Sequence, residues 1–405
     1  MHVLKNISIL YTCRMEGNQE SLHPVENAAI AWCDGMFEWV GKESELPKKY
    51  DTADTIDANG KIVIPGLVDC HTHLCFGGWR PDEFEMRTRG ESYLDIAKAG
   101  GGILSTVKST RKASFNELYE KAASLLQKMI RIGITTVECK SGYGLRFQDE
   151  IKQLNVYKKL QENFAVEIIP TFLGAHTIPP EFKGNRQGYI DLIIHEMIPY
   201  IAAEKLARFC DIFVEESAFT VDEARIILET AKEHGLIPKL HADQLSDGGG
   251  AELAAELGAI SADHLEKVSD TGLQKMAENN VTAVTLPLAS LYTQQPYLNC
   301  RRLLNLGVDV AVATDFNPGS APSFDIHLAM MLTCNHGRLT PSETLKAATI
   351  YSAKAIKAEE KTGSIEPGKK ADFILLNAPD INFWLYHFGG SKIESVYVKG
   401  VKVES

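Results

Sequence analysis

The amino-acid sequence predicts an α/β protein: a (β/α)8 TIM barrel with a small β-sandwich domain built from both chain ends. Strand-like and helix-like segments alternate through the middle of the chain, and eight of the apolar runs are typical of strands. Short β-rich pieces stand at both ends. Alternation of β and α with eight parallel strands is the pattern of a (β/α)8 barrel, and 405 residues suffice for a barrel with a satellite domain.

The two chain ends share a β-rich character. Turn residues such as Asp34-Gly35 divide the N-terminal part into four strand candidates: 3–10, 28–33, 37–40 and 55–56. Near the C-terminus a turn at 363–370 precedes a further strand, and two short strands flank Gly400. We therefore expect residues 1–60 and 356–405 to form the β-sandwich domain, and residues 61–355 to form the barrel.

The strand candidates of the barrel are, in order, 62–69, 135–139, 166–172, 211–214, 237–240, 259–262, 282–285 and 308–313. Apolar residues at three- and four-residue spacing predict helices between most of them, at 115–132, 149–163, 221–234, 249–256, 270–279 and 297–306. Active sites of such barrels lie at the C-terminal ends of the strands. Chemically capable side chains are therefore expected directly after these runs.

The first barrel strand ends in the sequence His71-Thr-His73. Side chains alternate along a strand, so the two imidazoles point the same way and can hold one metal ion. An isolated pair of this kind is about as often two surface histidines. Here, however, most later strand candidates also end in His, Asp or Glu. They lead into Glu138-Cys-Lys140, His176, Glu215-Glu216, His241-Ala-Asp243-Gln244, Asp263-His264 and Asp315.

Four of these residues, His71, His73, His241 and Asp315, would form a closed ligand shell with room for one water. A divalent ion lowers the pKa of a bound water from ~15.7 toward ~7, which supplies a nucleophile at neutral pH. His264 or Asp315 would act as the base beside that water. The alternative for His264 is a hydrogen-bond partner that only orients another group.

The number of metal ions depends on the residues at the end of the fourth barrel strand. Two-metal sites of this type usually need a carbamylated lysine or a bridging carboxylate there. This chain has Glu215 and Glu216 at that place, and its Lys140 comes after the second strand. We therefore expect one Zn²⁺ or Fe ion per chain, with a Glu-bridged second ion as the alternative.

The overall composition excludes several classes of partner. The formal net charge is −11, without a basic stripe, which argues against binding to nucleic acid or an anionic membrane. No run approaches the ~18 apolar residues of a membrane span, and the N-terminus has no apolar core of a signal peptide. The eight cysteines are scattered without a CxxC motif, as is usual for reduced thiols. We expect a cytoplasmic homodimer in which Cys70 and Cys75 pack rather than bind metal.

Several residues near the predicted metal site are candidates for substrate contacts. Arg80 follows the first strand by a short loop, and its guanidinium can grip a carboxylate with two parallel hydrogen bonds. Its alternative role is a surface salt bridge. Tyr93, Tyr143 and His176 would add polar contacts to a small ring. The run Gly100-Gly-Gly102 before a helix is either a lid hinge or a tight turn.

The motifs together resemble those of a known enzyme superfamily. The strand-one motif Pro65-Gly-Leu-Val-Asp-Cys-His71-Thr-His73, Asp315 after strand eight, and the segment Gly363-Ser-Ile-Glu-Pro-Gly-Lys-Lys-Ala-Asp resemble the amidohydrolase superfamily. A narrower resemblance is to its imidazolonepropionase family. It is carried by Thr72-His73-Leu-Cys-Phe-Gly-Gly-Trp-Arg80, Ser92-Tyr93-Leu-Asp-Ile, Gly100-Gly-Gly-Ile, Lys140-Ser-Gly-Tyr143-Gly-Leu, Thr171-Phe-Leu-Gly-Ala-His176, Ser261-Ala-Asp-His264-Leu and Ala313-Thr-Asp-Phe-Asn317-Pro-Gly319.

This resemblance implies a substrate and a set of site residues. The reaction would be hydrolysis of 4-imidazolone-5-propanoate to N-formimino-L-glutamate, a step of histidine degradation, with one Zn²⁺ or Fe ion and a metal-activated water attacking the ring carbonyl. The ligands would be His71, His73, His241 and Asp315. The substrate would lie among Arg80, Tyr143, His176, Asn317, Gly319 and Ser320. The propionate arm of this substrate needs a cationic anchor such as Arg80.

One position departs from some relatives. Where they carry Glu after the strand-five His-Ala-Asp, this chain has Gln244, which can donate and accept hydrogen bonds but cannot carry a proton. A catalytic role for Gln244 would therefore be limited to positioning the ring. Two alternatives stand beside this interpretation: another cyclic-amide hydrolase or deaminase of the superfamily, and a barrel without catalysis. The second would be expected to have lost ligands, and none is missing from the sequence.

Overall fold

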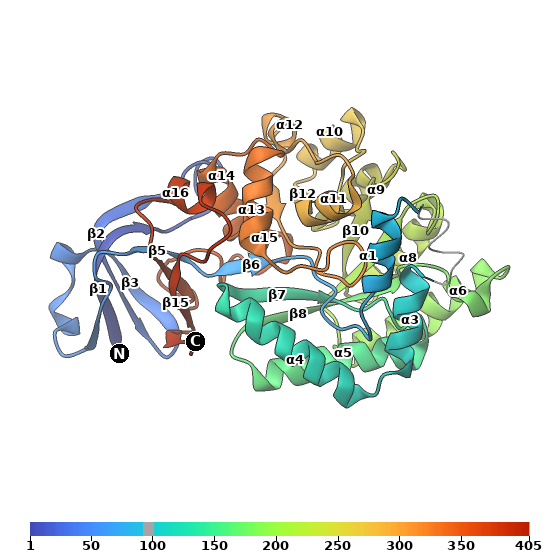
Figure 1. Cartoon of the computed structure of the whole chain (residues 1–405), viewed down its shortest axis with the longest axis horizontal. Coiled ribbons are helices and arrows are strands. Elements are labelled where there is room, and N and C mark those ends of the chain that lie inside the picture. Colours follow the sequence, from blue (N-terminus) through green and yellow to red (C-terminus); the bar gives the residue numbers. More distant parts are fainter. Residues whose placement is uncertain (92–100, 405) are drawn as a thin grey trace.

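The computed structural model describes residues 1–91 and 101–404 and contains two eight-stranded sheets (Figure 1). One sheet is all parallel and carries the helices on its outside. The other is formed by strands from both ends of the chain and lies to the left in Figure 1, where the N- and C-termini are found. The predicted combination of a (β/α)8 barrel and a terminal β domain is thus confirmed.

The barrel strands follow one another around the sheet in sequence order. They are β6 (Leu67–Asp69), β7 (Ile134–Lys140), β8 (Glu167–Ala175), β9 (Phe209–Val214), β10 (Ile237–Ala242), β11 (Ser261–His264), β12 (Thr282–Thr285) and β13 (Val310–Val312). Each neighbouring pair is parallel. A parallel bridge between Thr72 and Phe316, just beyond β6 and β13, brings the first and last strands together at the C-terminal mouth.

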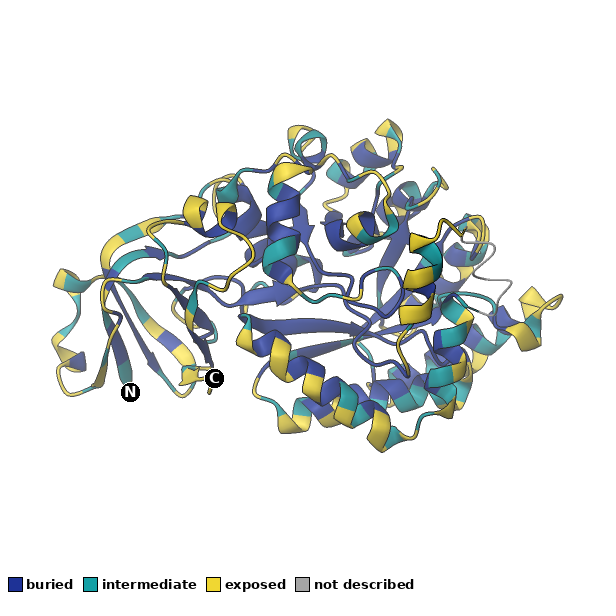
Figure 2. Cartoon of the chain, viewed as in Figure 1, coloured by how far each residue is buried: buried dark blue, intermediate teal, exposed yellow. Residues whose placement is uncertain are grey.

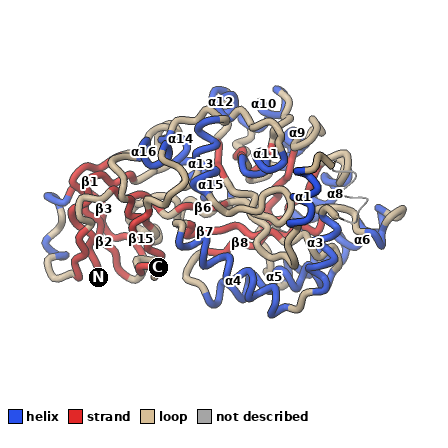
Figure 3. Tube along the Cα trace, viewed as in Figure 1, coloured by secondary structure: helices blue, strands red, loops and turns tan. Residues whose placement is uncertain are grey.

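Helices cover most of the outside of the barrel, and most of their buried faces point toward the strands (Figures 2 and 3). They are α1 (Pro81–Thr88), α3 (Ile103–Lys112), α4 (Phe115–Arg131), α5 (Phe147–Asn163), α6 (Arg186–Leu192), α7 (Ile198–Ala203), α8 (Val221–Glu233), α9 (Gly250–Leu257), α10 (Asp270–Glu278), α11 (Pro287–Thr293), α12 (Cys300–Asn305), α13 (Ile326–Asn335), α14 (Pro341–Ala347), α15 (Ile350–Ala355) and α16 (Ile381–Tyr386). Short helical turns lie at η1 (Glu43–Glu45), η2 (Lys48–Tyr50), η3 (Pro180–Phe182) and η4 (Ile193–Met197).

Sequence-encoded caps fix where several helices begin. Ser114 and Glu117 form a capping box at the start of α4, because each side chain accepts from the other's backbone N–H. Thr220 and Glu223 do the same for α8. Both helices begin at the residue expected from apolar periodicity, 115 and 221. No helix in the part of the chain that the structure describes is long and apolar enough to cross a membrane.

The terminal sheet joins strands that are far apart in the sequence. Its members are β1 (His2–Tyr11), β2 (Pro24–Cys33), β3 (Met36–Lys42), β4 (Asp54–Asp57), β5 (Ile62–Pro65), β14 (Phe373–Leu376), β15 (Ile393–Val398) and β16 (Val401–Lys402). The strand β14 pairs antiparallel with β5 and so links the two ends of the chain. The strands form one connected sheet with its own core, in which Trp32, Phe373 and Tyr397 pack as an aromatic group.

The structure corrects one predicted strand. The apolar run 62–69 is divided between two sheets, since β5 belongs to the terminal sheet and β6 to the barrel. The break falls at Gly66, whose N–H donates to Asp372 O at 3.0 Å. A Cβ at Gly66 would lie 2.2 Å from Thr135 Oγ1, so only glycine lets the chain pass β7 this closely.

The sixth barrel strand also ends later than expected, at His264, and the helix expected at 297–306 begins only at Cys300.

Candidate metal centre and substrate cavity

The first two candidate ligands lie directly after β6, inside the mouth of the barrel. His71 and His73 are buried, with ring centroids 5.4 Å apart. Hydrogen bonds to the neighbouring strands fix the backbone here. Asp315 N donates to His71 O at 3.0 Å, and His73 N donates to Phe316 O at 2.8 Å. The contact that closes the barrel therefore also places the two imidazoles.

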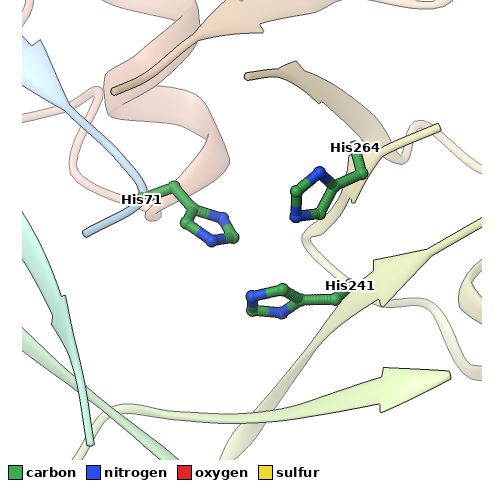
Figure 4. A group of neighbouring side chains, drawn as sticks. All are labelled: His71, His241 and His264. Carbon is green, nitrogen blue, oxygen red and sulfur yellow. The ribbon is translucent and has the colours of Figure 1, made fainter. Parts of the chain in front are cut away.

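Two further histidines point toward His71 from the other side of the barrel. His241 lies on β10 and His264 ends β11, and Figure 4 shows both rings converging on His71. The ring centroid of His71 is 4.5 Å from that of His241 and 5.9 Å from that of His264. His264 adopts φ +80°, a backbone conformation that is costly for a side chain with a Cβ and that is frequent at functional sites.

Asp315 completes the cluster from the loop after β13. Its Oδ1 is 3.4 Å from His71 Nε2 and 3.4 Å from His73 Nε2. Ligands at ~2.0–2.1 Å from one tetrahedral ion stand about 3.3 Å apart, so this spacing fits a shared ion. Asp315 itself has φ +52°, which turns its carboxylate back toward the histidines.

The chemical state of these groups also suits a metal ion. His71 Nε2, His241 Nε2 and Asp315 Oδ1 are buried and have no hydrogen-bond partner among the described residues. Burial, with help from Lys140 and His241, lowers the pKa of His71 to about 3, so its imidazole is neutral and its lone pair is free. Burial would raise the pKa of Asp315, but His71 and His73 hold it well below the usual range. A divalent cation matches a neutral imidazole nitrogen and an ionised carboxylate oxygen.

His264 lies closer to the cluster than the sequence suggested. The described residues contain two sets of ligand atoms within 4.8 Å of one another at this place: His71, His73 and Asp315, and His71, His241 and His264. Five side chains, rather than four, thus surround one region. The division into four ligands and one proton carrier remains a prediction, because His264 and His241 approach His71 in the same set.

A cavity of about 730 Å³ opens in front of this cluster. Most of the residues predicted from the sequence line it, namely His73, Arg80, Tyr143, His176, His241, Gln244, His264, Asp315, Asn317 and Ser320. His71 lies behind the wall as a buried residue, and Gly319 is not part of the lining. Tyr93 lies outside the described residues. Sequence reasoning did not single out Phe84, Arg87 or Tyr292, which belong to the lining as well.

Arg80 is held at the cavity by two neighbours. Its Nε is 3.5 Å from Glu83 Oε2. Glu83 Oε1 accepts from Gly102 N at 2.7 Å, which ties Arg80 to the start of α3. A Cβ at Gly319 would lie only 1.3 Å from Arg80 Nη2. The guanidinium of Arg80 thus lies directly against Gly319, where the sequence analysis expected the substrate. Gly102 has φ +75°, as expected of a turn, whereas Gly100 lies outside the described residues.

Tyr143 and His176 stand together on the side of His73. His176 stacks on His73 with centroids 5.3 Å apart, and Tyr143 lies 5.4 Å from His176. Burial lowers the pKa of His176 well below its usual value, so the ring is neutral. Its Nδ1 donates to Gly142 O at 3.0 Å, which leaves Nε2 as a hydrogen-bond acceptor. Burial raises the pKa of Tyr143, so its hydroxyl stays a donor.

Gln244 lies on a loop after β10 that carboxylates hold rigidly. Asp243 accepts from Gly250 N at 3.0 Å and from Ala251 N at 2.9 Å, which caps α9. Glu215 accepts from Leu245 N at 2.9 Å and also contacts Ser246 Oγ. The carboxylate of Glu215, the residue considered for a second metal ion, therefore accepts hydrogen bonds from this loop. It belongs to neither ligand set at the mouth.

Asn317 holds its own loop together. Its Oδ1 accepts from Gly319 N and Ser320 N, each at 2.8 Å, and its Nδ2 donates to Asp315 O at 2.7 Å. Both ends of the amide are thus in use. A substrate contact at Asn317 would therefore use the remaining lone pair of Oδ1 or the remaining N–H of Nδ2. The bond from Asn317 Nδ2 to Asp315 O also fixes the backbone of Asp315.

Two buried carboxylates behind the histidines have partners that sequence reasoning did not assign. Asp263 Oδ2 is 2.6 Å from His71 Nδ1, and Asp211 Oδ2 is 3.1 Å from His241 Nδ1. The signal in the sequence is a charged residue inside an apolar strand, which requires a buried partner. The partners themselves lie on other strands and are not readable from the sequence.

Comparisons with known proteins point to one family. Residues 62–403 match the model of the Amidohydrolase family. The imidazolonepropionase of Geobacillus thermodenitrificans is 49% identical over 387 residues, which cover 94% of this chain and 91% of that protein. The imidazolonepropionase of Fusobacterium nucleatum is 45% identical over 404 residues, with 98% and 97% covered.

Solved structures share the fold at low sequence identity. An adenosine deaminase from Xanthomonas campestris with bound zinc superposes with a TM-score of 0.71 at 16% identity, covering 99% of this chain and 92% of that one. A guanine deaminase from C. acetobutylicum gives 0.72 at 17% identity, with 100% of both chains covered. The family match and the close relatives show that this chain is a hydrolase that belongs to the amidohydrolase family and, within it, to the imidazolonepropionases.

Proposed function

We propose that this chain hydrolyses 4-imidazolone-5-propanoate to N-formimino-L-glutamate. In this reaction the oxygen of water adds to the ring carbonyl carbon. The adjacent ring C–N bond then breaks, and the nitrogen leaves with a proton that water supplied. The ring carbonyl becomes a carboxylate, and the propionate arm becomes the side chain of the glutamate product. The relatives at 45–49% identity over more than nine-tenths of the chain support this substrate.

The metal ion would be held by His71, His73, His241 and Asp315, and we propose one Zn²⁺ or Fe ion per chain. The 3.4 Å spacing of Asp315 Oδ1 from two imidazole nitrogens supports a shared ion. When bound, a divalent ion supplies Lewis acidity, which lowers the pKa of water toward ~7 and polarises a carbonyl oxygen. The hydrogen bonds from 245 and 246 to Glu215 argue against this residue as a bridge to a second ion.

The substrate carboxylate would lie at Arg80, whose side chain lines the same cavity as the histidines. A guanidinium forms two parallel hydrogen bonds with a carboxylate. Glu83 pairs with Nε of Arg80 and so holds the guanidinium in place before the substrate binds. The ring would then lie between Arg80 and the metal cluster, where His176 Nε2 can accept a ring N–H and the Tyr143 hydroxyl can donate to a ring acceptor.

Proton transfer would be carried by His264 and Asp315. Both side chains line the cavity; His264 lies beside the proposed ligands, and Asp315 is one of them. One of them takes the proton from the attacking water, and that proton is returned to the leaving nitrogen. Gln244 has no titratable proton, so its part is to hold the ring by hydrogen bonds.

We also propose a cytoplasmic homodimer. The eight cysteines are all free and most are buried, which supports a reducing compartment. Analytical ultracentrifugation of the purified protein checks the dimer, since a monomer at micromolar concentration would contradict it.

The convergence of four histidines and Asp315 on one cavity with a nearby arginine is the observation that carries this proposal. Turnover of 4-imidazolone-5-propanoate by purified, metal-loaded protein, followed by the loss of ring absorbance, is the direct test. Rapid turnover with formation of N-formimino-L-glutamate is expected. Turnover of another cyclic amide or of an aminated ring, with none of this substrate, would replace the proposal with a different reaction of the superfamily.

A further inference from the structure

A layer of charged side chains lies directly behind the candidate metal ligands. Lys140, Asp211 and Asp263 are fully buried and come from β7, β9 and β11. These are the second, fourth and sixth strands of the barrel. Side chains of alternate strands fill one layer of a (β/α)8 interior, and that layer usually consists of branched apolar residues. Three charges in that place need a specific reason, because burial of charge is costly.

Each carboxylate of this layer contacts one candidate metal ligand. Asp263 Oδ2 is 2.6 Å from His71 Nδ1, and Asp211 Oδ2 is 3.1 Å from His241 Nδ1. The first contact is a hydrogen bond, whereas the second is an ion-pair distance at which neither atom meets hydrogen-bond geometry. An anion beside Nδ1 favours the proton on that nitrogen and leaves the lone pair on Nε2. The Nε2 atoms of both histidines are buried and have no hydrogen-bond partner among the described residues.

One ammonium group serves both carboxylates. Lys140 Nζ is 2.8 Å from Asp211 Oδ2 and 3.7 Å from Asp263 Oδ2. It also lies 2.8 Å from Glu138 Oε1, while Lys239 Nζ is 3.6 Å from Asp263 Oδ2 and 2.6 Å from Ser261 Oγ. Without Lys140 the two aspartates would face each other and Glu138 across an interior that water does not screen. The repulsion among these carboxylates would then turn them away from the histidines, because the Lys140 ammonium would no longer offset it.

We propose that Lys140, acting through Asp211 and Asp263, is a positioning residue that holds His71 and His241 in the metal-binding tautomer and orientation. This inference rests on the metal site proposed above, and it adds a determinant of metal affinity that lies outside the ligand shell. Lys140 itself contacts three carboxylates and does not line the cavity. It is therefore neither a ligand nor a proton carrier.

The test measures metal affinity, not only activity. Lys140→Met combined with Glu138→Gln removes one buried cation and one buried anion, so the net charge of the layer is conserved. Glu138→Gln alone is the matched control, because Glu138 contacts Lys140, Thr171 and the backbone N–H of Thr72 but neither histidine ring, and a glutamine oxygen can still accept from Thr72. The dissociation constant for Zn²⁺ is obtained by competition with a chromophoric chelator on metal-free protein. We expect about 10–100-fold weaker binding in the double variant, the usual effect of losing an outer partner of a ligand histidine. The control should stay within about threefold of the parent.

A second readout separates positioning from general stability. In metal-free protein labelled with ¹⁵N-histidine, His71 and His241 should be Nδ1–H tautomers in the parent and mixed tautomers in the double variant. A purely structural role would lower the melting temperature but leave the tautomers and the dissociation constant unchanged. That result would overturn the proposal.

If the double variant does not fold, Asp263→Asn tests the proposal instead. The asparagine keeps an oxygen that can accept from His71 Nδ1, but it removes the negative charge that interacts with Lys140. Binding of Zn²⁺ weakened by about tenfold or more is expected, and parental affinity would contradict the inference. A parent protein that binds no metal would instead refute the proposed metal site itself, so the two failures are distinguishable.

Discussion

The terminal sheet and the barrel follow each other in the chain at Gly66, between β5 and β6, and their interiors differ. Ile62–Pro65 enters the terminal sheet, whose core is apolar and aromatic, with Phe373 and Tyr397 stacked at 4.4 Å. Leu67–Asp69 enters the barrel, whose upper interior holds imidazoles, carboxylates and lysines. Apolar packing needs only shape and area, whereas the polar interior needs every group paired. Changes in the first region should cost stability, and changes in the second should cost chemistry.

The largest effect should come from removing the C-terminal part of the terminal sheet. We propose that both chain ends form one domain, so deletion of residues 361–405 should give insoluble or unfolded protein. It removes β14 and β15 and exposes the partners of Phe373, Leu375 and Tyr397. Burial of each large side chain contributes ~1.5–3 kcal/mol, and a domain has only ~5–15 kcal/mol in total.

Solubility and far-UV circular dichroism measure this effect. Deletion of residues 401–405 is the matched control, because Val401 is 69% exposed and β16 lies at the sheet edge. The control should fold normally. A soluble, active protein lacking 361–405 would refute the shared domain.

In the barrel, His264→Ala should lower kcat by ~10²-fold or more with metal content intact, as is usual for a general acid–base group. Steady-state kinetics and elemental analysis of the same sample check both parts. His387→Ala is the control, since that exposed histidine follows α16 and not a barrel strand. Loss of metal in His264→Ala would make His264 a ligand, and near-normal kcat would leave it a packing role.

Arg80→Ala tests the proposed anchor for the substrate carboxylate in the cavity. Loss of a charge-assisted hydrogen bond costs ~1.5–3 kcal/mol, so kcat/KM should fall by roughly one to two decades. Arg80→Lys should also be impaired, because a point charge does not replace the planar fork. Arg89→Ala, an exposed arginine paired with Glu85, should have no such effect. An equal loss for an analogue without the carboxylate would refute the anchor.

Gln244→Glu should have the smallest effect. If the residue only holds the ring, glutamate should be tolerated within about tenfold near neutral pH, with a new acidic limb in the pH profile of kcat/KM. A large gain in kcat would show that this position can carry a proton after all. Complete inactivity would assign it a hydrogen bond that a carboxylate cannot replace.

The same comparison explains what the sequence could predict. Periodicity and strand ends sufficed for the barrel and for placing His71, His73, His241 and Asp315 at one mouth. The split at Gly66 was not predictable, because the apolar pattern is continuous and the close approach to Thr135 is a tertiary contact. The roles of Asp211 and Asp263 depend on Lys140, which is 71 residues before Asp211 in the chain.

The loop that carries Arg80 also shows what the sequence could not predict. Arg80 was predicted from its charge and its distance from the first strand. Its support by Glu83 and its contact with Gly319 depend on how three separate segments meet. Side-chain identity therefore predicts which chemistry is present, and the fold decides which neighbours orient it.

The most direct test of a single metal centre is a metal titration of metal-free protein with turnover measured at each step. Activity on 4-imidazolone-5-propanoate should be below ~1% of the loaded protein without metal and should rise linearly with added Zn²⁺ or Fe²⁺ to a plateau at about one ion per chain. A plateau reached only at two ions per chain, or full activity in metal-free protein, would contradict a single metal centre at these strand ends.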